Sequence, residues 1–192
     1  VYELAVHGDA LYAGLGGEAG AGGVWRVDDN DAWRQMAGDG VNGNWDNPSA
    51  DYVIALTDFK SCLVASTERV PTARGEFSTI WALEDDGWHP VGIRAVPRQW
   101  GKMHSFNALH AYRGNLLLGA GGAPGGKASL WRLDFRGTWQ LFAGYGKNGS
   151  WGARDGGKPI ARRTAREYVY RMIEHEGVLI VGFGESAGCG QG

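Results

Sequence analysis

Three tryptophans share a local pattern that suits ligand binding. Trp45, Trp100 and Trp151 end the segments VNGNW, VPRQW and KNGSW, and each follows a polar stretch that contains Gly or Pro. The flat face of an indole stacks on the C–H surface of a sugar ring, and polar neighbours complete such sites. The three residues are therefore candidate aromatic platforms for sugar rings or another flat ligand.

A cluster of basic residues follows the last of these tryptophans. The stretch GARDGGKPIARRTAREYVYR, residues 152–171, carries many positive charges and only two acidic residues. A guanidinium group donates paired hydrogen bonds to carboxylates and phosphates, so the stretch favours an acidic partner. The alternative is a basic loop that is only solvated. The candidate arginines are Arg154, Arg162, Arg163 and Arg166.

Signals of metal or cofactor chemistry are weak. The sequence has no HExxH pair, no CxxC pair and no GxxxxGK[ST] phosphate loop, and its five histidines are scattered. His7 and His175 follow the same apolar pattern in two segments, which predicts turn residues and not metal ligands. We therefore predict no catalytic residues, no metal and no cofactor, and leave enzymatic activity uncertain with a preference for none.

The elements that position these residues follow from the spacing of all nine tryptophans. They form three triplets with a first gap of 8, 7 and 8 residues and a second gap of 12 each time, and equivalent members recur every 50 to 56 residues. A period near 50 is typical of a radial or solenoidal array of repeats. The triplets are Trp25, Trp33 and Trp45; Trp81, Trp88 and Trp100; and Trp131, Trp139 and Trp151.

Each repeat predicts four short strands. Apolar and β-branched segments alternate with turns rich in Gly, Asp and Asn, and in the first repeat they fall near 2–7, 10–14, 23–28 and 33–37. The second of these strands ends in a small residue in every repeat. Four strands in about 50 residues make one blade of a β-propeller. A sandwich or a β-solenoid is the alternative all-β arrangement.

The predicted fold is all-β, a β-propeller with three complete four-stranded blades and half of a fourth. We expect one partial domain over 1–192, because the fourth repeat stops after its second strand. A propeller closes with about four to eight blades. The sequence is therefore expected to be a fragment, with the remaining blades supplied by the rest of the chain or by another chain. The blades are predicted at about 1–50, 51–104, 105–165 and, incomplete, 166–192.

The turn between the third and fourth strands carries a family resemblance. RVDDNDAW (26–33) and RLDFRGTW (132–139) resemble degenerate Asp-box repeats, Ser-x-Asp-x-Gly-x-Thr-Trp, with Asp28 and Asp134 in the Asp position. The chain is thus similar to sialidase-like and sensor-like bacterial propellers. The resemblance implies that these aspartates accept backbone N–H groups in a turn, away from any active site.

The repeat also predicts which side chains are structural. The first two tryptophans of each triplet should be buried between neighbouring sheets. The constant 12-residue gap also allows Trp45, Trp100 and Trp151 to be wedges between blades. At one position of the innermost strands the repeats carry Glu3, Ala55, Ala108 and Arg171, and the two alanines favour a plain packed channel.

Composition and loop lengths complete the functional prediction. A net charge of −2 argues against a general nucleic-acid partner, and no apolar run reaches the roughly 20 residues that membrane insertion needs. We expect a non-catalytic binding or assembly module that presents long loops on one face to a glycan or an acidic protein surface. The alternative is a sialidase-like glycan hydrolase with its site in the central well. The compartment stays open, with a preference for the extracellular space or the cell surface.

Overall fold

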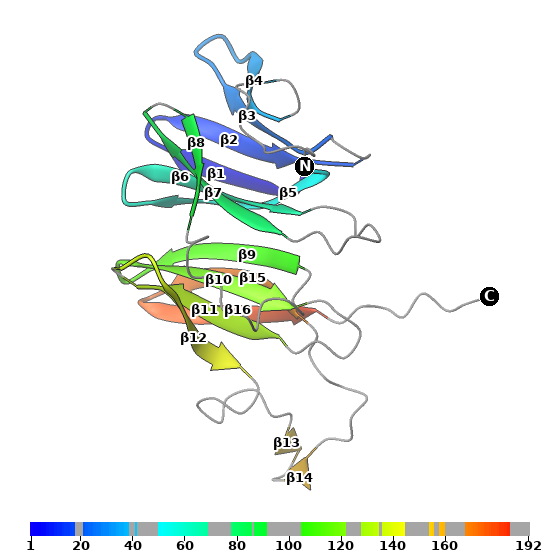
Figure 1. Cartoon of the computed structure of the whole chain (residues 1–192), viewed down its shortest axis with the longest axis vertical. Helices are drawn as coiled ribbons and strands as arrows, with labels where there is room; N and C mark the ends of the chain where they lie inside the picture. Colours follow the sequence, from blue (N-terminus) through cyan, green and yellow to red (C-terminus); the bar gives the residue numbers. More distant parts are fainter. Residues whose placement is uncertain are drawn as a thin grey trace, which may run out of the picture.

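The computed structural model shows an all-β chain (Figure 1). Within the described residues there is no helix, and therefore no helix long and apolar enough to span a bilayer. The described residues are 1–17, 21–38, 41, 50–68, 78–85, 87–91, 105–121, 128–134, 136–144, 154–155, 158–159 and 168–184.

The strands form three four-stranded antiparallel sheets and a two-stranded fourth, as predicted. Sheet 1 contains β1 (Glu3–His7), β2 (Ala10–Leu15), β3 (Gly23–Val27) and β4 (Trp33–Ala37). Sheet 2 contains β5 (Tyr52–Phe59), β6 (Cys62–Glu68), β7 (Thr79–Glu84) and β8 (Gly87–Pro90). Sheet 3 contains β9 (Ser105–Tyr112), β10 (Asn115–Gly121), β11 (Ser129–Leu133) and β12 (Trp139–Gly144). Sheet 4 contains β15 (Tyr168–His175) and β16 (Val178–Gly184), and a separate short pair joins β13 (Arg154–Asp155) to β14 (Lys158–Pro159).

The sheets are ordered in space as they are in the chain. Within each sheet, consecutive strands are neighbours, and the first strands of consecutive sheets contact one another: β1 with β5, β5 with β9 and β9 with β15. Figure 1 shows sheets 1 and 2 in the upper half, sheets 3 and 4 below them, and the β13–β14 pair apart from all four. A series of like sheets that touch mainly their neighbours is the expected result of a sequence repeat.

The small residue near the end of each second strand lets the next sheet approach closely. A Cβ atom on Gly14 of β2 would lie 2.9 Å from the side chain of Val53 on β5. A Cβ atom on Gly119 of β10 would lie 2.5 Å from the side chain of Val169 on β15. Real Cβ atoms essentially never come so close, so a larger residue would push the two sheets apart.

In sheet 2 the small residue that allows the next sheet to approach is a serine. The hydroxyl of Ser66, which is fully buried, donates a 2.8 Å hydrogen bond to the backbone carbonyl of Phe106 on β9. In sheet 4, a Cβ atom on the equivalent Gly182 would meet only atoms of Arg171, which belongs to the same sheet. The close approach therefore occurs at the three boundaries where one described sheet follows another.

Each sheet boundary is filled by an apolar cluster made from both sheets. At the boundaries of sheets 1 and 2 and of sheets 2 and 3, small and branched residues of the first sheet face larger leucines and tryptophans of the next. At the boundary of sheets 1 and 2, sheet 1 contributes Ala10, Tyr12, Val24 and Ala37, and sheet 2 contributes Val53, Leu56, Leu63, Ala65, Trp81 and Trp88.

The prediction of buried tryptophans is confirmed in sheets 2 and 3 and is wrong for one residue of sheet 1. Trp33 is 48% exposed and Trp25 is half-buried. Their equivalents in sheets 2 and 3 face the preceding sheet, whereas no described sheet precedes sheet 1. The buried residues, with exposed fractions of 2–6%, are Trp81, Trp88, Trp131 and Trp139.

The turn aspartates act as the sequence predicted. The carboxylate of Asp28 accepts hydrogen bonds from the backbone N–H groups two and four residues further on, at 2.9 and 3.0 Å. Asp134 does the same at 2.9 Å in both cases. The N–H of Thr138, followed by that of Arg136, holds the pKa of Asp134 below its usual range. These aspartates stabilise the β3–β4 and β11–β12 turns.

The sheet boundaries predict that replacing equivalent tryptophans by alanine lowers the free energy of unfolding by different amounts. Trp81→Ala should lower the free energy of unfolding by about 3–5 kcal/mol, because it leaves a cavity between two sheets. Trp33→Ala should cost less than about 1.5 kcal/mol, since nearly half of that side chain already contacts solvent. Chemical denaturation of both variants checks this, and equal losses would contradict the assignment of covered and uncovered faces.

Candidate functional site

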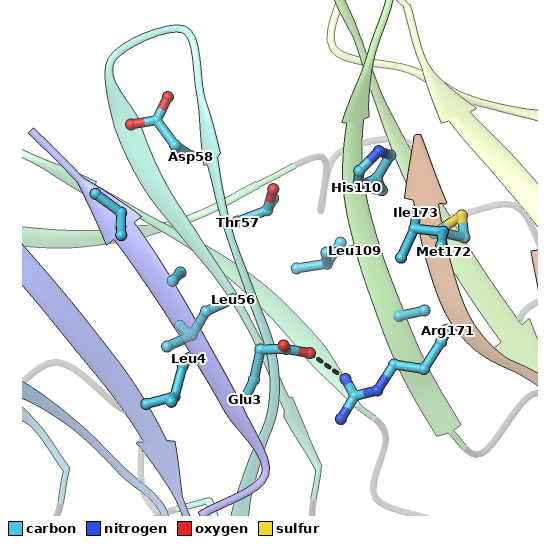
Figure 2. Close-up of a pocket in the computed structure, with 13 residues that line it drawn as sticks. Glu3, Leu4, Leu56, Thr57, Asp58, Leu109, His110, Arg171, Met172 and Ile173 are labelled. Atoms are coloured by element: carbon cyan, nitrogen blue, oxygen red, sulfur yellow. Dashed lines mark hydrogen bonds and ion pairs between the residues drawn. The ribbon is translucent and has the colours of Figure 1, made fainter. Parts of the chain in front are cut away.

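The first strands of the four sheets surround a pocket of about 320 Å³ (Figure 2). This volume is within the range of small-molecule sites, about 300–1,000 Å³. The expectation of a plain packed channel is therefore wrong, although the four innermost strands do line one common space. The lining residues are Glu3, Leu4, Ala5 and Val6 of β1; Leu56, Thr57 and Asp58 of β5; Ala108, Leu109 and His110 of β9; and Arg171, Met172 and Ile173 of β15.

An ion pair joins the first and last of these strands. The guanidinium of Arg171 donates to the carboxylate of Glu3, and its other nitrogen donates to the backbone carbonyl of Tyr2 at 2.7 Å. Figure 2 shows the two side chains reaching toward each other from β1 and β15. Glu3 pairs with Gly14 in the β1–β2 register, so the ion pair lies at the end of the pocket where the β2–β3 loop begins.

Burial and the ion pair act on Glu3 in opposite directions. Burial of the carboxyl group is the larger effect and raises its pKa above the usual range for glutamate. The positive charge of Arg171 lowers the pKa but does not cancel the effect of burial. A carboxyl group of this kind is held in place by its partner and still binds a proton at a higher pH than an exposed glutamate does.

His110 is a second polar group in the pocket wall. Its Nε2 atom is buried and has no hydrogen-bond partner among the described residues. Burial lowers the pKa of His110, while the nearby charge of Glu174 raises it by less. The neutral imidazole is therefore favoured, and the tautomer decides whether the buried nitrogen carries the proton.

A second polar contact lies at the other end of the first strands. The Nδ1 atom of His7 lies 2.5 Å from a carboxylate oxygen of Asp58, which connects β1 with β5. The ring of His7 also contacts Tyr12 edge-on, with 5.9 Å between ring centroids. His7 and His175 were predicted to be turn residues, but each is the last residue of a strand, β1 or β15, and the turn begins at the next residue.

The remaining wall is apolar. Leu56, Leu109 and Met172 are buried, whereas Leu4 and Ile173 are more than half exposed. A pocket with one apolar wall and separate donor and acceptor groups suits a small polar molecule that also has a hydrophobic face, such as a sugar ring. No group of three potential metal ligands occurs among the residues that the structure describes.

The residues that the sequence analysis selected for binding lie mostly outside the described part of the chain. Trp45, Trp100, Trp151, Arg162, Arg163 and Arg166 are all outside it. Arg154 is the first residue of β13, whose backbone pairs with β14 at Pro159. Their convergence on one face remains a prediction.

The sequence held one clear signal for the pocket. Glu3 and Arg171 occupy the same repeat position, and residues at one position of the innermost strands face one channel in a radial array. Opposite charges at that position could have predicted an ion pair between the first and last sheets. His110 gave no comparable signal, because its equivalents Ala5, Thr57 and Ile173 share no chemistry with it.

One further catalytic motif lies near the end of the chain. The segment GESAG, residues 184–188, fits the G-x-S-x-G pattern of a nucleophile elbow, in which Ser lies between a strand of a parallel sheet and a helix. Here the preceding strand, β16, pairs antiparallel with β15. Ser186 is outside the described residues, and the described surroundings do not support a hydrolase elbow.

Comparisons with known proteins assign no family. Neither models of protein families nor curated proteins gave a match to the chain. The functional argument therefore depends on the geometry of the pocket and on the repeat.

The environment of Glu3 predicts an unusual pH dependence of stability. Its pKa is raised on folding, so its contribution to stability is largest below the ordinary glutamate pKa and is lost as the pH rises through the folded value. Wild-type stability relative to Glu3→Gln should thus fall as the pH rises through the acid range. Denaturation at several pH values checks this, and carboxyl NMR of Arg171→Met should show the Glu3 pKa raised further.

His110 gives an independent titration test. Its imidazole should titrate below the usual histidine range, because burial disfavours the charged ring. Glu174→Gln should lower that pKa further, since the carboxylate is the one charge that raises it. NMR of the ring protons across the pH range measures both, and an upward shift in the variant would contradict the assignment.

Proposed function

We propose that the chain is a non-catalytic binding module built as a partial β-propeller, with its ligand held at the channel between the innermost strands. Three observations support the propeller arrangement. Like sheets follow one another in chain order, their first strands contact in series, and β1 and β15 are joined by Arg171 and Glu3. In this arrangement the pocket is the central channel.

The single observation that carries the proposal is the pocket itself. Four strands from four repeats line it, and it combines an apolar wall with the Glu3–Arg171 pair and the side chains of Thr57 and His110. Rigid strands, and not loops, hold these groups, which favours binding with little loss of conformational entropy. A sugar ring offers hydroxyl groups for the polar side chains and C–H surface for the leucines.

The long loops would enlarge this site. The β2–β3 loop begins beside Glu3, so the loops of the same face extend from the ion-paired end of the pocket. We place Trp45, Trp100, Trp151 and the arginines of 154–166 on this face. There they would form the surface that binds a larger glycan or an acidic protein. Arg171 is already neutralised by Glu3, so the arginines of the loops are the groups left to recognise acidic substituents.

A glycan hydrolase is the second candidate, and one observation favours it. The pocket contains two carboxylates in different settings, Glu3 with a raised pKa and Asp58 beside His7. Glycosidases use one protonated and one ionised carboxyl group. Both carboxylates are engaged by a basic partner, however, and within the described part of the chain Arg171 is the only arginine that lines the pocket, where a sialidase-like site needs three.

A substitution that fills the pocket with a large side chain tests whether the ligand binds in the pocket or only to the loops. Thr57→Trp should place an indole in the channel and weaken glycan binding at least tenfold, which is about 1.4 kcal/mol. Ser61→Trp replaces a small hydroxyl residue by tryptophan at the exposed β5–β6 turn, so it is the matched control and should change nothing. Glycan-array binding followed by titration calorimetry measures this.

Two further results would decide between the candidates. Trp151→Ala, and separately Arg162→Ala with Arg163→Ala, should weaken binding to larger or acidic glycans if the loops contribute. Release of reducing sugar by the wild type, abolished by Glu3→Gln, would replace the binding module with the hydrolase. Unchanged array and pull-down profiles in all of these variants would refute both.

A further inference from the structure

Sheet 1 exposes an apolar face whose equivalents are covered in sheets 2 and 3. Leu11 is 37% exposed and Trp33 is 48% exposed, whereas Trp88 and Trp139, at the position of Trp33, are 4% and 2% exposed. In sheets 2 and 3 this face packs against the preceding sheet. The side chains of sheet 1 are therefore of the kind that elsewhere form a sheet boundary.

Sheet 4 offers a strand edge next to that face. The second strand of sheets 1, 2 and 3 pairs with a third strand, but β16 pairs only with β15 within the described residues. Val178 and Ile180 on β16 are 61% and 48% exposed. They occupy the positions of Ala10 and Tyr12, which are buried in the boundary between sheets 1 and 2.

The edge and the exposed face border the same space. The side chain of Arg171 on β15 donates to Glu3 and to the carbonyl of Tyr2, and so links the first strand of sheet 4 to the start of sheet 1. Leu4 and Ile173, one from each sheet, line the same pocket and are both more than half exposed. By the order of strands in sheets 1, 2 and 3, the strands that would continue sheet 4 beyond β16 are a third and a fourth strand, which form a hairpin.

We propose that the β16 edge and the exposed face of sheet 1 form a docking site for a β-hairpin. The hairpin adds antiparallel to β16, as β3, β7 and β11 add to their second strands. One of its faces carries small or branched residues that cover Leu11 and Trp33. The partner is thus a strand pair with the pattern of β11–β12, and it binds by strand addition.

The described chain supplies a probe of this chemistry. A synthetic peptide of residues 129–144 contains β11 and β12, and Ser129 pairs with Gly144, so a disulfide from Ser129→Cys and Gly144→Cys closes it as a hairpin. The full chain should bind this peptide saturably in fluorescence anisotropy. Hydrogen exchange should then show new protection of the backbone N–H groups of 178–184.

Variants of the face complete the test. Leu11→Glu should weaken peptide binding at least tenfold, and Trp33→Gln, at a largely exposed site, gives the same readout if Leu11→Glu does not fold. Ser61→Glu adds the same charge at the exposed β5–β6 turn and should bind as the wild type does. A peptide of the same composition in scrambled order should not bind.

Three outcomes would overturn the proposal. The first is no binding by the closed peptide, and the second is binding that protects strands other than β16. The third is self-association of the chain that Leu11→Glu abolishes and that excludes the peptide, which would assign the face to a second copy. A failure of glycan binding leaves the hairpin site intact, because the two experiments use different surfaces.

Discussion

The structure depends on a close crossing between the second strand of one sheet and the first strand of the next. At Gly14 and Gly119 there is no room for a Cβ atom, because the side chains of Val53 and Val169 occupy that space. At Ser66 the crossing is polar, and the hydroxyl is held by a backbone carbonyl of the next sheet. These contacts fix how closely each sheet approaches the previous one, and tryptophans fill the rest of the boundary between sheets 1 and 2 and between sheets 2 and 3.

The same crossing creates the pocket. Because first strands contact first strands, residues from all four sheets line a common space, even though Glu3 and Arg171 are far apart in the sequence. At the repeat position of these two charged residues, sheet 3 contributes Ala108 to the pocket. The Glu3–Arg171 pair connects the first and the last sheet at one end of the pocket, and polar and apolar side chains from all four sheets line the space beside it.

Sequence periodicity was a good guide to the strands and a poor guide to the surroundings of each sheet. The gap patterns predicted β1 to β4 to within one or two residues, because turns and apolar alternation are local properties. Trp33 was misjudged because equivalence in a repeat implies equal surroundings, which fails at a sheet with one uncovered face. The pocket was missed because alanine at two positions says nothing about how far apart the other strands are held.

The Ser66 contact has a consequence for how the chain folds. Each sheet is coupled mainly to its neighbours, so order spreads along the chain by one boundary at a time, as in other repeat proteins. The boundary of sheets 2 and 3 adds a buried hydroxyl–carbonyl bond to its apolar cluster, and both sheets contribute four strands. We therefore expect the boundary of sheets 2 and 3 to persist longest when the chain opens locally, and the terminal sheets to open first.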